Sequence, residues 1–159
     1  MFSVTLIAVG KLKEAFYRDA AAEYAKRLGA YCSLTIVELP EQRLPEDPSP
    51  AQIAQALERE ADAVEKCIPK GAWLAALTPE GKELSSEEFA ALLARVKNSA
   101  SCVCLLLGSS FGMAERLKQR ADLRLSMGKM TFPHHLARIM ALEQLYRAES
   151  IQAGSRYHK

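Results

Sequence analysis

Residues 102–112 read CVCLLLGSSFG, in which six consecutive apolar residues run into a turn bounded by two glycines. A short, continuous apolar run is typical of a strand that is buried on both faces, as the strands of a parallel sheet are. Three further strand patterns precede it, at residues 2–9, 33–39 and 72–77, and a shorter one follows at 122–126. Together they predict the sheet of an α/β protein.

Helical patterns lie between the strands. The run SSEE at residues 85–88 has the form of a capping box, which predicts the start of a helix that continues to about residue 98. The other expected helices cover residues 14–28, 52–67, 113–120 and 133–150. Because strands and helices alternate along 159 residues, we expect a single domain whose mostly parallel sheet is flanked by helices.

The loop at residues 40–50 contains four prolines, which excludes regular structure there. A loop of this kind is either a lid over a site or only a connection. Because exposed connections are the more frequent case, we favour the second interpretation.

The composition is that of an average globular protein, with 49% hydrophobic and 25% charged residues. No apolar run approaches the roughly 20 residues of a membrane helix, and the four cysteines form no C-x-x-C motif. We therefore expect a cytoplasmic protein with reduced cysteines and no membrane partner. Residues 112–159 hold 9 Lys and Arg against 4 Asp and Glu, whereas residues 1–111 hold 12 against 15, which favours a polyanionic partner.

Glycines follow three successive strands. In open α/β sheets, ligands bind beyond the carboxyl ends of the strands, where Gly81, Gly108 and Gly128 are expected to lie. Glycine there can bring the backbone close to a ligand. The G-x-G-x-x-G fingerprint and the P-loop are absent, so we expect a cofactor held by backbone amides and apolar walls rather than by its phosphates.

The sequence contains no motif for a metal site or for a covalent hydrolase. His134 and His135 are adjacent and lack a third ligand at a suitable spacing, so they indicate a helix start and no metal site. The nucleophile motif G-x-S-x-G does not occur.

The last helix and the tail after it carry most of the polar chemistry. Apolar residues surround much of this helix, so a second subunit is a reasonable cover for one of its faces. Glu143 and Arg147 form either a surface ion pair or a buried pair that fixes an interface or a site. The chain ends SRYHK, in which cations, an aromatic ring and an imidazole could hold a phosphate, stack on a base and move a proton.

Several motifs are shared with a known family. They are the apolar strand that ends at Gly108, the run LSMGKMTFPH at residues 125–134, Arg138, the run EQLYRA at 143–148 and the final YHK. With its length and its opening run IAVGK at residues 7–11, the chain resembles the bacterial SPOUT methyltransferases that act on N3 of pseudouridine 1915 in 23S rRNA. The resemblance covers essentially the whole chain.

The resemblance implies a C-terminal trefoil knot, a homodimer, and S-adenosylmethionine held by the loops of the knot. Carried over by position, cofactor contacts fall on Leu77, Gly108, Met127, Gly128, Lys129, Met130, Thr131 and Phe132. The chain departs from the common pattern at Ser109, where many relatives have a second glycine, and at Met127-Gly128, where relatives often have Phe-Ser. Neither change removes backbone donors, so we expect altered cofactor affinity at most.

The chemistry of the family requires alignment of a methyl group with N3 and removal of the imide proton. We expect His158 or Tyr157 to assist deprotonation or base placement, and Arg147 and Arg138 to stabilise charge beside them. RNA contacts are expected at His134, Arg156 and Lys159. The implied partner is 23S rRNA within the ribosome, without DNA, and each site is expected to combine the knot of one protomer with the tail or last helix of its partner.

Two other classes of function stay open on the residues alone. A flavodoxin-like or other nucleotide-dependent α/β enzyme would also place glycines after its strands. A non-catalytic dimeric module that binds RNA or ribosomes through the basic last third would bind without transferring a methyl group.

Overall fold

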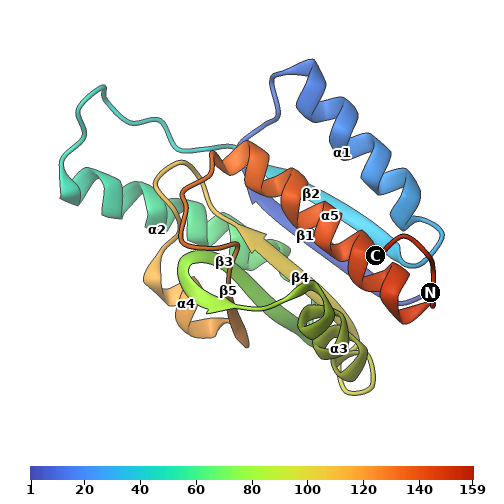
Figure 1. Ribbon diagram of the computed structural model, residues 1–159. Helices are drawn as coiled ribbons and strands as arrows, with labels where there is room; N and C mark the ends of the chain where they lie inside the picture. The colour runs from blue at the N-terminus through green and yellow to red at the C-terminus, as the bar shows by residue number, and fades with distance from the viewer.

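A five-stranded sheet organises the computed structural model, which describes residues 1–159. The strands are β1 (Ser3–Val9), β2 (Ser33–Leu39), β3 (Ala72–Glu83), β4 (Cys102–Leu107) and β5 (Leu123–Ser126). They lie in the order β2-β1-β4-β3-β5, and every neighbouring pair is parallel (Figure 1). The predicted parallel sheet is confirmed, and the apolar run at 102–107 is its fully buried central strand.

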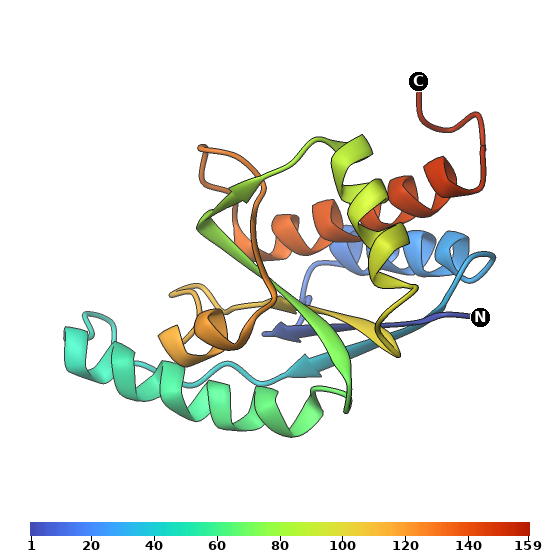
Figure 2. The ribbon, with the colours of Figure 1, turned by 90° about the horizontal axis from the view of Figure 1, so that it is seen from below.

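Helices cover both faces of the sheet, as predicted. On one face lie α1 (Ala15–Leu28), α3 (Ser86–Val96) and α5 (His134–Gln152), and on the other lie α2 (Pro50–Cys67) and α4 (Glu115–Arg120) (Figure 2). Alternate strand residues face two separate cores. In β1, Leu6 and Ala8 pack toward α5, whereas Ile7 and Val9 pack toward α2.

Capping boxes start two of the helices. Ser85 Oγ accepts a hydrogen bond from the Glu88 amide at 3.1 Å, and Glu88 Oε2 accepts one from the Ser85 amide at 2.7 Å, which confirms the predicted box. Ser49 and Gln52 form a second reciprocal pair, so α2 begins at Pro50 rather than at residue 52. Proline is well suited to the first helical position because its missing N–H would have no partner there.

Strand β3 is longer than predicted, because it continues to residue 83 instead of ending at 77. Leu77 and Lys82 both oppose Leu125 of β5, and the register is irregular between them. Pro79 lies in this irregular stretch, where its missing N–H interrupts no regular ladder. A Cβ on Gly81 would lie 2.7 Å from the carbonyl carbons of Arg124 and Leu125, so the backbone of β5 lies directly against this glycine.

The proline-rich loop is one residue shorter than predicted, because Pro50 begins α2. Residues 40–49 contain no helix or strand. All four cysteines are free, and burial raises the pKa of the Cys104 thiol to about 12. None of the helices combines the length and the apolar character that crossing a membrane requires.

Candidate functional site

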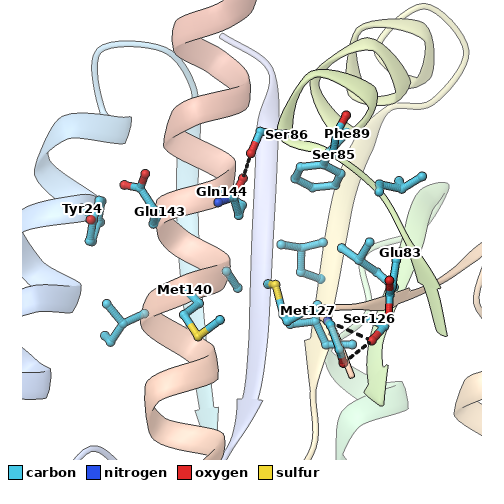
Figure 3. A pocket seen from close by; sticks show the side chains of 17 residues that line it. Tyr24, Glu83, Ser85, Ser86, Phe89, Ser126, Met127, Met140, Glu143 and Gln144 are labelled. Atoms are coloured by element: carbon cyan, nitrogen blue, oxygen red, sulfur yellow. Dashed lines mark hydrogen bonds between the residues drawn. The ribbon is translucent and has the colours of Figure 1, made fainter. Parts of the chain in front are cut away.

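A pocket of about 440 Å³ opens on the α5 side of the sheet, between α5 and the start of α3 (Figure 3). The sheet contributes Leu77, Glu83, Leu105, Leu125 and Ser126. The helices and connecting turns contribute Tyr24, Leu84, Ser85, Ser86, Phe89, Met127, Gly128, Ile139, Met140, Ala141, Glu143 and Gln144. A mostly apolar lining with a few polar groups is typical of small-molecule sites.

Side-chain hydrogen bonds hold the walls of the pocket (Figure 3). Ser126 Oγ donates to the Pro79 carbonyl at 3.1 Å and accepts from the Gly128 amide at 3.1 Å. This hydroxyl therefore joins the turn after β5 to the irregular part of β3. Across the pocket, Ser86 Oγ donates to Oε1 of Gln144 at 2.6 Å, which ties the start of α3 to α5.

The turn after β5 leaves open space beside Gly128. This glycine has a φ of +127°, and no atom lies within 4 Å of the position that a Cβ would take, while its amide is hydrogen-bonded to Ser126. Thr78 follows Leu77, and its buried hydroxyl has no hydrogen-bond partner. A buried hydroxyl without a partner is uncommon in folded proteins, and Thr78 is not among the residues that line the pocket.

The C-terminal tail, residues 153–159, folds back along α5 to the rim of the pocket. Tyr157 donates its hydroxyl to Oε2 of Glu143 at 2.9 Å. Arg147 donates from Nε and Nη2 to Oε1 of the same carboxylate, at 2.8 and 2.6 Å. The side chains of Arg147 and Glu143 are 24% and 18% exposed, so the i,i+4 pair is a partly buried pair of the pocket wall.

The charge states of this cluster follow from its packing. Burial and the neighbouring Glu143 carboxylate raise the pKa of Tyr24 to about 12 and raise the pKa of Tyr157. The hydrogen bond to Glu143 also raises the pKa of Arg147. Near neutral pH, both phenols are therefore neutral and the guanidinium is a cation.

Three of the residues predicted to hold a cofactor line the pocket, namely Leu77, Met127 and Gly128. Residues 129–132 lie in the loop before α5, outside the lining. Gly108 borders a separate narrow cleft beside α2 and α4. The structure thus brings the turn after β5 to the end of β3, whereas the turn after β4 reaches a different cleft.

Three of the four residues predicted to be catalytic meet at the pocket rim. Tyr157 and Arg147 share the Glu143 carboxylate, and His158 lies beside Arg147. Arg138 is not with them, because it is 2% exposed and donates to the Glu38 carboxylate and to a backbone carbonyl. To reach RNA, Arg138 would have to leave these partners.

The residues predicted to contact RNA are not gathered on one surface. His134 begins α5, whereas Arg156 and Lys159 are exposed residues that follow the end of the same helix. Burial and the neighbouring His135 lower the pKa of His134, so its ring is neutral near pH 7.

A second polar cluster, which no sequence motif predicted, joins the proline-rich loop to the turn after β4. Glu60 on α2 is 5% exposed and accepts hydrogen bonds from the Ser109 hydroxyl and the Gln42 amide, both at 2.8 Å. Glu41 accepts from the amide and the hydroxyl of Ser110. The hydroxyl of Ser109 therefore joins this turn to α2 by a hydrogen bond.

Glu60 makes the stability of the protein depend on pH. Its burial raises its pKa above the ordinary value of 4.5, so the folded state holds the proton more tightly than the unfolded state. The resulting stability is present below about pH 4.5 and is lost as the pH rises through the higher folded-state pKa. Urea unfolding should therefore show a smaller loss of stability between pH 4.5 and 7 in Glu60→Gln than in the wild type. Exposed Glu46 provides the control, Glu46→Gln, and an equal loss in both variants would contradict this role.

Comparison with known proteins places the chain in a family. A family model described as predicted SPOUT methyltransferase matches residues 2–158. The chain is 46% identical over 157 residues to ribosomal RNA large subunit methyltransferase H of Bifidobacterium adolescentis, covering 98% of this chain and 99% of that one. It is 43% identical over 163 residues to the protein of the same name from Moorella thermoacetica, with 100% of both chains covered.

Solved structures agree in fold. A probable methyltransferase from Bordetella pertussis matches with a TM-score of 0.57 at 18% identity, over 92% of this chain and 93% of that one. A probable methylase family protein from Haemophilus influenzae matches with a TM-score of 0.55 at 12% identity, over 99% of this chain and 70% of that one. At these identities the structures show the fold alone. The family model, however, spans nearly the whole chain, so the resemblance seen in the motifs is confirmed and the chain belongs to the SPOUT methyltransferase family.

Proposed function

We propose that the protein transfers a methyl group from S-adenosylmethionine to N3 of pseudouridine 1915 in 23S rRNA. The observation that carries the proposal is the pocket at the ends of β3 and β5, at whose rim Arg147, Tyr157 and His158 gather. Relatives that match over their full length and are named ribosomal RNA large subunit methyltransferases support the same reaction.

The pocket residues fit this cofactor. Its volume of about 440 Å³ lies in the range of small-molecule sites, and its apolar walls suit an adenine ring. The carboxylate of Glu83 lines it and suits a positively charged sulfonium, whereas the carboxylate of Glu143 is already paired with Arg147. Leu77, Met127 and Gly128 would hold the cofactor in the pocket. By the resemblance, Gly108 and residues 129–132 would contact its edges.

The cofactor supplies a methyl group that is already activated by the positive charge of the sulfonium. The protein has to orient N3, exclude water and remove the imide proton. Tyr157 is a protonated phenol that donates to Glu143, so His158 is the better proton acceptor of the two. Arg147 would stabilise the negative charge that develops on the base.

RNA binding should depend on the exposed cations of the tail. Arg156→Ala is expected to weaken binding to ribosomes and to lower the slope of log K against log salt by about 0.7 to 0.9, the contribution of one phosphate contact. Filter binding between low and moderate salt measures this slope. Arg43→Ala in the proline-rich loop removes an equally exposed cation as a control. Unaltered binding of Arg156→Ala at every ionic strength would exclude a phosphate contact.

We also propose that residues 1–159 form one methyltransferase domain with the trefoil knot of its family, and that it acts on ribosomes in the cytoplasm. The knot is proposed from the family resemblance alone. A homodimer is implied by the family resemblance, and the 65% exposed Phe16 on α1 is an apolar side chain that a second copy could cover.

Mixed dimers test whether two protomers share each site. A dimer would pair one chain changed in the turn after β5 with one chain that lacks the tail. If each site combines both elements from different protomers, such a dimer recovers one working site and about half of the wild-type activity. No recovery would contradict a shared site.

The function itself is tested with 70S ribosomes that lack the modification. They are incubated with the protein and labelled S-adenosylmethionine, and the labelled nucleotide is mapped. We expect label on N3 of pseudouridine 1915. Ribosome binding without label would support the non-catalytic module instead. Calorimetric binding of flavin or ATP, without binding of S-adenosylmethionine, would support the nucleotide-dependent alternative.

A further inference from the structure

His158 lies between two helices that form opposite walls of the pocket. Its Nδ1 is 3.1 Å from Nη1 of Arg147 on α5, and its Nε2 is 2.7 Å from Oε1 of Glu87 on α3. Glu87 directly follows Ser86, which lines the pocket. Arg147 is hydrogen-bonded to Glu143, which also lines the pocket. The ring of His158 thus links the two walls.

The two neighbours of the ring select one tautomer. A guanidinium has only donors, so Nδ1 of His158 must accept from Arg147 with its lone pair. The hydrogen bond with His158 lowers the pKa of Glu87, so this carboxylate is ionised and can only accept. Nε2 must therefore carry the proton. The arrangement fits a neutral imidazole with its lone pair on Nδ1.

We propose that Glu87 is a positioning residue that fixes His158 as the Nε2–H tautomer and docks the tail on the start of α3. This inference rests on the proposed function, in which His158 accepts the imide proton. A base needs a lone pair on a defined atom, and a carboxylate that holds the opposite N–H provides it. In this structure Arg147 occupies the Nδ1 lone pair, so its Nη1 has to move aside before a substrate proton can approach Nδ1.

Glu87 is not required for the core. Its side chain is 64% exposed, and the capping box of α3 uses Ser85 and Glu88 instead. Glu87→Ala should therefore fold, and loss of its hydrogen bond can be separated from loss of structure. Glu87→Gln keeps an oxygen that can accept from Nε2–H, so it serves as the conservative variant.

The test is long-range ¹H–¹⁵N NMR of the histidine rings in the full-length protein. In the wild type and in Glu87→Gln, we expect His158 to show a protonated Nε2 and an unprotonated Nδ1. In Glu87→Ala the tail is released from α3, the ring leaves Arg147, and we expect a mixture of tautomers. Glu14→Gln, which changes the carboxylate 3.8 Å from His135, is the matched control and should leave His158 unchanged. A single tautomer in Glu87→Ala, or mixed tautomers in the wild type, would overturn the proposal.

Activity gives a second and independent readout. By displacing the ring, Glu87→Ala should lower turnover by up to about 10²-fold with an unchanged KM for S-adenosylmethionine, and Glu87→Gln should recover most of it. If the wild type transfers no methyl group but keeps one His158 tautomer, the proposed function fails and the role of Glu87 stands. If the wild type is active and the tautomer does not depend on Glu87, only the positioning role fails.

Discussion

Gly108→Ala is expected to lower the free energy of unfolding by about 3 kcal/mol, the upper end of ordinary overpacking. A Cβ at this position would lie 2.3 Å from the carbonyl oxygen of Gly112 and 3.1 Å from the amide nitrogen of Met113. Both are backbone atoms, and Gly112 exchanges two hydrogen bonds with Ser109, at 3.0 and 2.9 Å. The turn after β4 would have to open to admit a methyl group.

Urea unfolding of Gly108→Ala beside Gly29→Ala measures this effect. Gly29 has a φ of −58° at the end of α1, and the nearest atom to its Cβ position, the carbonyl oxygen of Lys26, is 3.3 Å away. This control should change stability by less than about 1 kcal/mol. Equal stability of the two variants would contradict the close packing of the turn at Gly108.

The opened turn also affects the second polar cluster. Ser109 and Ser110 follow Gly108 and are the residues that Glu60 and Glu41 hold. Because the Gln42 amide shares the Glu60 carboxylate, the proline-rich loop loses an anchor when the turn moves. Amide hydrogen exchange at residue 42 should therefore speed up in Gly108→Ala and stay unchanged in Gly29→Ala.

The sheet could be predicted because each strand is marked by local chemistry. The run 102–107 is apolar throughout since both of its faces are buried, and its predicted bounds are those of β4. The end of β3 could not be predicted in the same way. Pro79 and Gly81 are typical of a turn, and only the double pairing of Leu125 with Leu77 and Lys82 explains why the strand continues past them.

The candidate site was predictable where it depends on strand ends. Gly128 follows from the rule that ligands lie beyond the carboxyl ends of parallel strands, whereas Leu77 and Met127 were predicted from the family resemblance. Ser86 and Gln144 were not predicted as site residues. Their hydrogen bond depends on how α3 packs against α5, and no local sequence pattern indicates that packing. Likewise, the residue types of the tail indicated its chemistry, but its partners on α3 and α5 could not be predicted.

His158→Ala is expected to lower the turnover of methyl transfer by about 10²-fold or more, because it removes the proton acceptor. The ring lies in the tail and is absent from both cores, so the free energy of unfolding should change little. His135→Ala is the matched control, since His135 also lies beside a carboxylate, 3.8 Å from Glu14, but has no contact with Arg147, the residue that links His158 to Glu143 of the pocket wall.

The kinetic constants decide what His158 does. Loss of a base lowers kcat while the KM for ribosomes stays unchanged, whereas loss of an RNA contact raises KM with kcat intact. Unchanged turnover in His158→Ala would remove the imidazole from proton transfer. The proton would then have to leave by way of Tyr157, whose raised pKa makes it a poor acceptor near neutral pH, so activity would rise toward alkaline pH and Tyr157→Phe would abolish it.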